Sequence, residues 1–319
     1  MHKLLTRPQW PGRSQARWSA KIIDYQRAPE SLHSLNQAWF SVSGKPFFGL
    51  ALLGLADDEG VRLNGGRPGA RLGPDAFRQA LAAYGAAGAI ALNGLELPVF
   101  DVGNICPAAT LDETHSRISQ IVSELLQAGL MPIGVGGGHD LTFPVVRSVI
   151  NELASPGQPL DGVYFDAHLD VREQAGSGMP FRRLIEHGGI GKLHVLGMDA
   201  LSNTVAHLRW FENNGGHLAA WSPSDWPQSS LQFVSICLDV VDMAQAPGVS
   251  APAPVGWSAA RLAEYAEAAG RNPAVCCFDI MELCPPHDEK GRTARLAAHL
   301  FLRFLAGLNQ RIADQQGAA

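Results

Sequence analysis

Short apolar segments that alternate with helix-like segments limit the folds open to this chain. These segments lack the polar/apolar alternation of a strand with one face in water, so we expect each to be buried on both faces. We predict eight such strands, at residues 47–55, 97–102, 132–135, 162–166, 193–197, 217–221, 233–239 and 275–280. Helices are predicted from residue 73 onwards and at 111–130, 141–150, 203–214, 257–270 and 292–308. This order predicts a three-layer α-β-α fold of the α/β class, with a mostly parallel eight-stranded sheet.

The chain is long enough for one large domain, and no sequence feature divides it. Its 319 residues are 46% hydrophobic and 17% charged, which is ample for a sizeable core. The sequence contains no internal repeat and no low-complexity linker. We therefore predict a single domain over residues 46–319 and an irregular N-terminal arm, residues 1–45, that packs on its body.

The composition argues against several classes of function. The net charge of -5 and the pI near 6.1, without a cluster of Lys and Arg, argue against binding to nucleic acid or to a membrane surface. No apolar run reaches the ~18 residues of a membrane span, and the N-terminus lacks the apolar core of a signal peptide. The five cysteines are an odd number with two adjacent, which does not suggest a disulfide framework, so we expect a reduced, cytoplasmic protein.

Polar side chains follow the predicted strand at 162–166. Asp166, His168 and Asp170 are spaced two apart, so in an extended segment all three project to one side. In open α/β sheets, ligands bind outside the carboxyl ends of the strands. Two carboxylates and an imidazole are costly to desolvate there unless something neutralises them, and a divalent metal ion does so directly. Taken alone, the motif fits equally well a polar strand end that is wetted by solvent.

Two further strand ends favour the metal. His139 follows three glycines at 136–138, and Cys237 and Asp239 lie two apart at the end of another strand. Alone, the first motif fits an ordinary tight turn with a capping histidine, although the glycines also permit close backbone approach and unusual dihedrals. The combined set of two histidines, three carboxylates and a thiol is large for one ion and suits two ions that share carboxylates. Such a pair can lower the pKa of a bridging water and polarise an electrophile.

These motifs resemble the three signature segments of the ureohydrolase superfamily, which includes arginase, agmatinase and formimidoylglutamase. They read G-G-G-H-D at 136–140, D-A-H-L-D at 166–170 and S-x-C-x-D at 235–239. Further segments at 60–70, 170–172, 177–181, 246–252 and 282–298 make the chain most similar to the formimidoylglutamase branch. The resemblance spans about residues 47–308 and implies an arginase-like fold. It also implies a homo-oligomer that hydrolyses the small molecule N-formimidoyl-L-glutamate to L-glutamate and formamide in histidine degradation.

The resemblance implies two Mn²⁺ ions and a role for each motif residue. The implied ligands are His139, Asp166, Asp170 and Cys237 for one ion, and Asp166, His168, Asp239 and Cys237 for the other. A hydroxide that bridges the ions would attack the amidine carbon of the substrate. Asp170 would hand a proton to the departing glutamate nitrogen. Glu282 would pair with the cationic formimidoyl group.

The two carboxylates of this substrate call for cationic side chains. Arg172 lies just past the metal motif and can form a bidentate fork with one carboxylate. Arg62, Asn64 and Arg67, in a long glycine-rich loop at 56–70, are candidates for the other. The alternative for such arginines is a salt bridge, or cover for apolar surface. Ser177 stands where arginase has an active-site histidine, which counts against arginine as the substrate.

Cys237 departs from the superfamily, which has an aspartate that bridges both metals at this position. A carboxylate suits Mn²⁺, whereas a thiolate favours softer ions such as Zn²⁺. The alternatives are a bridging thiolate with an altered metal preference, a weakly held single ion with reduced activity, or a non-catalytic relative. The cysteine is otherwise most simply a small buried residue. The remaining ligands and the arginines favour an enzyme, and another guanidino-acid or amidine hydrolase is the second candidate.

Overall fold

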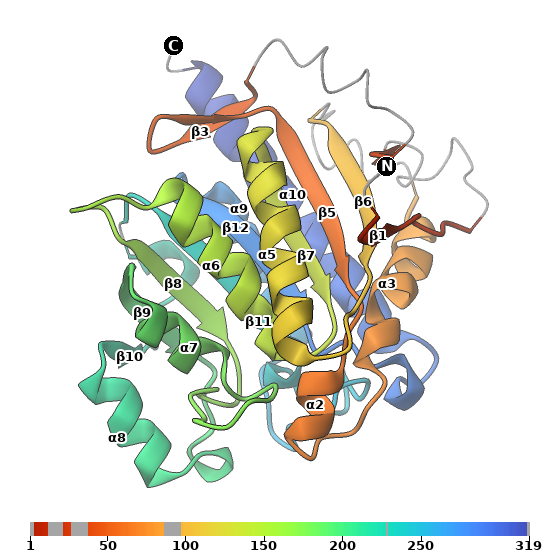
Figure 1. The fold of residues 1–319 in the computed structure, drawn as a ribbon, viewed down its shortest axis with the longest axis vertical. Helices are drawn as coiled ribbons and strands as arrows, with labels where there is room; N and C mark the ends of the chain where they lie inside the picture. The colour runs from red at the N-terminus through yellow and green to blue at the C-terminus, as the bar shows by residue number, and fades with distance from the viewer. Residues whose placement is uncertain (1–2, 12–21, 27–37, 86–96, 228, 318–319) are drawn as a thin grey trace.

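A large sheet forms the centre of the protein. The structure is a computed structural model, and it describes residues 3–11, 22–26, 38–85, 97–227 and 229–317. Ten strands form the sheet, and all neighbours are parallel except the antiparallel pair β1 and β6. The strand order is β1 (Leu5–Thr6), β6 (Val99–Ile105), β5 (Gly49–Leu55), β7 (Leu130–Gly136), β12 (Val275–Met281), β11 (Gln232–Cys237), β8 (Leu160–Phe165), β9 (Ile190–Leu196) and β10 (Gly216–Leu218), and β2 (Ile22–Asp24) also pairs with β6 (Figure 1).

The predicted α/β class and the mostly parallel sheet are confirmed, but the sheet has ten strands rather than eight. The two additional strands, β1 and β2, come from the N-terminal arm and pair with the outer edge of β6. Strands of two and three residues are too short to show a hydrophobic pattern, so the open edge of β6 determines their position. Residues 12–21 and 27–37 of the predicted arm lie outside the described residues. The strands β3 (Phe40–Val42) and β4 (Lys45–Phe47) form a separate hairpin.

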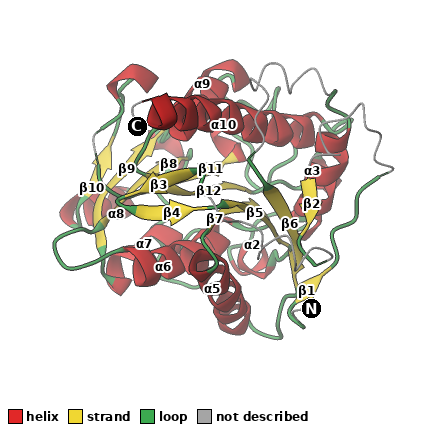
Figure 2. Cartoon of the chain, turned by 90° about the horizontal axis from the view of Figure 1, so that it is seen from above, coloured by secondary structure: helices red, strands yellow, loops and turns green. Residues whose placement is uncertain are grey.

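Helices cover both faces of the sheet, as Figure 2 shows, with α9 and α10 on one face and α5 and α6 on the other. The helices are α2 (Glu59–Leu63), α3 (Gly73–Ala82), α5 (Leu111–Gln127), α6 (Thr142–Leu153), α7 (Pro180–His187), α8 (Val205–Asn213), α9 (Ala259–Arg271) and α10 (Arg292–Gly317). The sequence did not predict α2 and α7, which are short. None of the helices in the described part of the chain combines the length and the apolar character needed to cross a membrane.

The helix α5 shows how the sequence sets these elements. The side chain of Thr110 accepts a hydrogen bond from the backbone of Glu113, and the Glu113 side chain accepts one from the backbone of Thr110. This capping box satisfies N–H groups that the first turn leaves without partners. One apolar face of α5 is buried, and the chain turns out of the helix at Gly129 with φ +71°. This face consists of Ile118, Ile121, Val122, Leu125 and Leu126.

The three glycines after β7 bring two backbone segments close together. A Cβ on Gly136 would lie 2.5 Å from the Cβ of Leu55, and one on Gly137 only 1.7 Å from the carbonyl oxygen of Asp57. The predicted close approach is therefore present. The predicted unusual dihedrals are wrong, because none of the three glycines has a positive φ.

We predict that the buried ion pair between Arg78 and Asp101 is essential for stability. Asp101 accepts hydrogen bonds of 2.8 Å from both Nε and Nη2 of Arg78, and both side chains are almost fully buried. The substitution Asp101→Ala leaves the guanidinium without this partner and should reduce the free energy of unfolding by about 3–5 kcal/mol in urea unfolding. As a control, Glu186→Ala removes an exposed partner of Arg182 and should cost less than about 0.5 kcal/mol. Equal effects of the two substitutions would contradict this prediction.

Candidate metal centre

The carboxyl ends of four adjacent strands bring the candidate residues together. These strands lie in the order β7-β12-β11-β8 in the centre of the sheet. His139 follows β7, Glu282 follows β12, Cys237 ends β11, and Asp166 follows β8. Parallel strands end at the same edge of a sheet, so segments that are far apart in sequence meet here.

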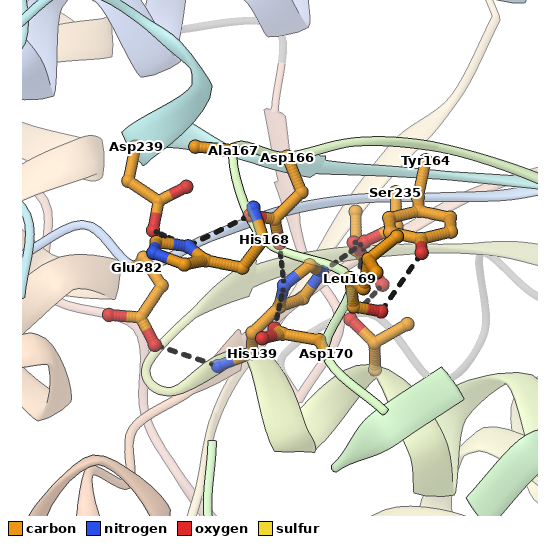
Figure 3. A network of polar contacts seen from close by, with 12 residues as sticks. His139, Tyr164, Asp166, Ala167, His168, Leu169, Asp170, Ser235, Asp239 and Glu282 are labelled. Atoms are coloured by element: carbon orange, nitrogen blue, oxygen red, sulfur yellow. Dashed lines mark hydrogen bonds and ion pairs between the residues drawn. The ribbon is translucent and has the colours of Figure 1, made fainter. Parts of the chain in front are cut away.

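The imidazoles of two histidines lie among the carboxylates. The Nδ1 atom of His139 lies 2.8 Å from Oδ2 of Asp166 and 2.9 Å from Oδ2 of Asp170. The Nδ1 atom of His168 lies 3.2 Å from Oδ1 of Asp166 and 3.2 Å from Oδ2 of Asp239 (Figure 3). The predicted strand ends therefore converge on one place, and Asp166 lies between the two histidines.

The spacing of Asp166, His168 and Asp170 suggested that they converge because side chains alternate along a strand. The structure shows a different cause. The strand β8 ends at Phe165, and residues 166–170 form an irregular turn in which Asp170 has φ +48°. Hydrogen bonds hold this turn in place: the backbone N–H of His168 donates to Asp166 Oδ1 at 2.6 Å, and that of Leu169 donates to Asn203 Oδ1 at 2.8 Å. A spacing of two residues brings the side chains together because the turn is fixed, and not because the segment is extended.

The site residues form two groups with metal-ligand chemistry. In each group, one ligand atom from every member lies within 4.8 Å of the others. The first group is His139, Asp166 and Cys237, and the second is Asp166, His168 and Asp239. The only residue common to both is Asp166.

Buried polar atoms at the centre support the assignment to a metal. Nδ1 of His139, Oδ2 of Asp166 and Oδ1 of Asp239 are buried and have no hydrogen-bond partner. Because Nδ1 of His139 and Oδ2 of Asp166 are only 2.8 Å apart, they face the same region without being aligned for a hydrogen bond. A cation satisfies such convergent lone pairs, so the residues fit a metal.

The charges at the site also call for cations. Burial alone would lower the pKa of His168, but Asp239 and Asp166 outweigh it and raise that pKa to about 12. Burial and the charge of Asp166 raise the pKa of Asp170 to about 6. Burial and the surrounding acids also raise the pKa of the Cys237 thiol well above its usual value. Without a metal, the negative charges of the site therefore keep His168, Asp170 and Cys237 protonated up to a higher pH. A divalent ion would displace these protons.

A second layer of hydrogen bonds orients His139. Ser235 donates to Oδ1 of Asp279, so its oxygen accepts from Nε2 of His139 at 3.0 Å. The other oxygen of Asp279 accepts from Thr142 at 2.9 Å. This chain places the ring proton on Nε2 and leaves Nδ1 free as a ligand. The sequence analysis did not identify Asp279 or Thr142, although an acid within the apolar strand β12 was a visible signal.

Glu282 is held rigidly beside the metal ligands. Its backbone has φ +67°, an unfavourable conformation for a side chain of this type. Its carboxylate accepts hydrogen bonds from the backbone N–H of His139 at 3.0 Å and from the hydroxyl of Ser250 at 2.6 Å. Burial raises the pKa of Glu282 to about 8. The strained backbone and the two donors fix the direction in which this acid faces the cavity.

A cavity of about 290 Å³ opens above the two groups. Arg172 lines it, and its Nη1 donates to Oδ1 of Asn64 at 2.7 Å. Arg67 lines it as well and donates to the carbonyl oxygens of Val249 and Ser250. Lining residues that the sequence analysis did not identify are Ser202, Asn203, His207, Ser250 and Ala251, whereas the predicted Ser177 is present.

Arg62 lies elsewhere. Its side chain is 63% exposed and pairs with Glu59, one turn away on α2. Arg62 is not among the residues that line the cavity. The structure therefore places it in a surface salt bridge, which was the alternative considered for an arginine in this loop.

The geometry agrees with comparisons to known proteins. The model of the arginase family matches residues 49–307. Formimidoylglutamase of Nocardia farcinica is 31% identical over 93% of this chain and 96% of its own length, and that of Aeromonas salmonicida is 35% identical over 83% and 88%. The crystal structure of Trypanosoma cruzi formiminoglutamase with Mn²⁺₂ superposes with a TM-score of 0.73 at 29% identity, over 82% of this chain and 94% of that one. The chain belongs to the arginase family.

We predict that Asp166 is required by both ions, because it belongs to both ligand groups. The substitution Asp166→Asn should reduce the metal content at both positions, measured by elemental analysis after loading with Mn²⁺ and dialysis. As a control, Asp242→Asn should leave the metal content unchanged, since the Asp242 carboxylate accepts a hydrogen bond from the backbone of Ala244 outside the cavity. If the Asp166→Asn variant kept the full metal content, the assignment of this residue would be wrong.

Proposed function

We propose that this chain is a metal-dependent formimidoylglutamase, which hydrolyses N-formimidoyl-L-glutamate to L-glutamate and formamide. The observation that carries the proposal is the pair of ligand groups that share Asp166 at the base of a cavity with two arginines in its lining. The names of the relatives in the comparisons support the same substrate. We also propose that residues 46–319 form one domain and that the protein assembles as a homo-oligomer, as the resemblance implies.

Two divalent ions, when bound, would lower the pKa of a water molecule and polarise the amidine carbon. The proposed ligands are His139, Asp166, His168, Asp170, Cys237 and Asp239. The presence of Mn²⁺₂ in the T. cruzi structure supports manganese at a centre of this kind.

Two acids would act on the reacting end of the substrate. Glu282 faces the cavity with its carboxylate held by the His139 backbone and by Ser250, so it is positioned to pair with the cationic formimidoyl group. Asp170 also lines the cavity, and its Oδ2 lies 2.9 Å from His139 Nδ1. We assign to Asp170 the transfer of a proton to the departing nitrogen of glutamate.

The glutamate end would bind at the lining arginines. Arg172 uses one nitrogen on Asn64, which orients its guanidinium and leaves donors for a substrate carboxylate. Asn64 therefore acts through Arg172. Arg67 donates two hydrogen bonds to backbone carbonyls and has fewer N–H groups left for a ligand, so it is the weaker candidate for the second carboxylate. Ser177 adds a hydroxyl to the same lining.

Identifying the reaction products tests the proposed function. Purified protein loaded with Mn²⁺, and separately with Zn²⁺ or Co²⁺, should release formamide from N-formimidoyl-L-glutamate. Release of urea from a guanidino acid, without formamide, would favour the second candidate, another hydrolase of the family. If no ion supported the release of either product, the proposed function would be wrong.

We predict that Arg172 contributes to substrate recognition through charged hydrogen bonds. Each such bond is worth about 1.5–3 kcal/mol, so Arg172→Ala should lower kcat/KM on the order of 10- to 100-fold, mostly through KM. Arg62→Ala is the matched control, since this arginine pairs with Glu59 on the surface. Steady-state kinetics of formamide release measure both effects. Equal losses in the two variants would show that recognition does not depend on Arg172.

A further inference from the structure

The two ligand groups at the candidate centre differ in chemistry. His139, Asp166 and Cys237 offer a nitrogen, an oxygen and a sulfur, whereas Asp166, His168 and Asp239 offer one nitrogen and two oxygens. We propose that the centre is asymmetric, with Zn²⁺ at the sulfur-containing position and Mn²⁺ at the oxygen-rich position. This inference rests on the proposed function only in assuming that two ions bind.

The first argument concerns the number of donor atoms on residue 237. An aspartate has two oxygens and can give one to each of two ions, as the bridging aspartate of the superfamily does. A thiolate has a single donor atom. The sulfur of Cys237 groups with His139 and Asp166 and also donates a hydrogen bond to the Asp239 carboxylate, but the group of Asp166, His168 and Asp239 does not include it. We therefore assign the sulfur to the first ion, against the alternative of a thiolate that bridges both ions. Asp166 is then the only carboxylate that belongs to both groups.

The second argument is that Cys237 cannot move to a bridging position at low cost. It is the last residue of β11, which pairs with β12 on one side and with β8 on the other. Its position is paired with Met281 in β12, and only 1% of the residue is exposed. With its backbone held by the sheet, the short side chain has one bond about which to rotate.

The third argument comes from ligand preference. Zn²⁺ binds thiolate and imidazole tightly, whereas carboxylates and water suit Mn²⁺. Asp170 lies 2.9 Å from Nδ1 of His139 but is not part of this group, which therefore supplies three donors. Sulfur, nitrogen and oxygen are all usual zinc ligands, and a water molecule can complete the usual coordination number of four.

The fourth argument is the difference in burial. His139, Asp166 and Cys237 are each at most 1% exposed. The side chain of His168, in the oxygen-rich group, is 29% exposed. The cavity reaches both groups, since His139 and Cys237 line it together with His168 and Asp239. The oxygen-rich group nevertheless has the more exposed side chain, which suits an ion that keeps part of its hydration shell.

The test uses the full-length protein after removal of metals, titrated with Co²⁺ as the probe. Charge-transfer absorption from thiolate to Co²⁺ should rise with about one equivalent and then stop, because the second ion does not contact sulfur. The absorption should be lost in Cys237→Ser and kept in Cys276→Ala, which removes a buried thiol bound to the carbonyl of Gln232. Circular dichroism and thermal unfolding verify that both variants are folded. An absorption that is absent, or that grows through two equivalents, would overturn the proposal.

Metal competition provides the second measurement. Equilibrated with buffered Zn²⁺ and an excess of Mn²⁺, the protein should hold about one ion of each kind per chain. In Cys237→Asp the bound Zn²⁺:Mn²⁺ ratio should shift at least about tenfold towards Mn²⁺, because an oxygen ligand replaces the sulfur. The same ratio in both proteins would contradict the inference.

Failure of the inference and failure of the proposed function give different results. Formamide release by a protein whose two ions are both Mn²⁺, with no sulfur-to-metal absorption, would keep the function and reject the asymmetry. A mixed centre with the expected absorption, but without formamide release under any loading, would keep the asymmetry and reject the function.

Discussion

The carboxylate of Asp166 is buried between two imidazoles, and the rest of the site is arranged around it. One oxygen lies 2.8 Å from His139 and the other 3.2 Å from His168, while the residue itself has no exposed surface. Burying an acid beside further acids costs several kcal/mol for each charge unless positive charge accompanies it. The arginines that line the cavity do not supply this charge, since Arg67 and Arg172 are bound to other acceptors. Without a metal, protons on His139 and His168 supply this charge, and a divalent ion that displaces them takes over the same role.

The sheet makes this arrangement possible by fixing where each segment ends. Four central strands end at one edge, and short irregular turns then set the directions of the side chains. Support also comes from within the sheet, because Asp279 and Ser235 on two neighbouring strands hold the outer nitrogen of His139. Rigid ligands of this kind keep a centre in position without the metal, and the strained backbone of Glu282 is tolerated because its carboxylate and its backbone are both tied to the turn after β7.

Elements with a long hydrophobic pattern could be predicted from the sequence, and elements defined by their surroundings could not. The strands around the site and the helix α5 each contain many apolar residues. The sequence therefore predicts whether each element is a strand or a helix, and roughly where it lies. By contrast, β1 and β2 exist because β6 has an open edge. The metal-ligand character of the site could be predicted because its motifs lie at the ends of predicted strands. The roles of Asp279 and Asn203 were not, since each depends on a hydrogen bond across more than 30 positions of the chain.

The proposed asymmetry depends on residue 237, where the resemblance to the superfamily implies a bridging aspartate and this chain has Cys237. Asp166 contacts both histidines directly, and Ser235 orients His139 from behind, whereas Asp239 lies in a short helix that begins directly after Cys237. A thiol at residue 237 therefore leaves the contacts of Asp166 and His139 in place, and it changes the type, the number and the charge of the donor atoms at this position. That donor belongs to the group whose three members are each at most 1% exposed. In the proposed asymmetric centre, the ion at this group adapts to the sulfur, and the oxygen-rich group holds Mn²⁺.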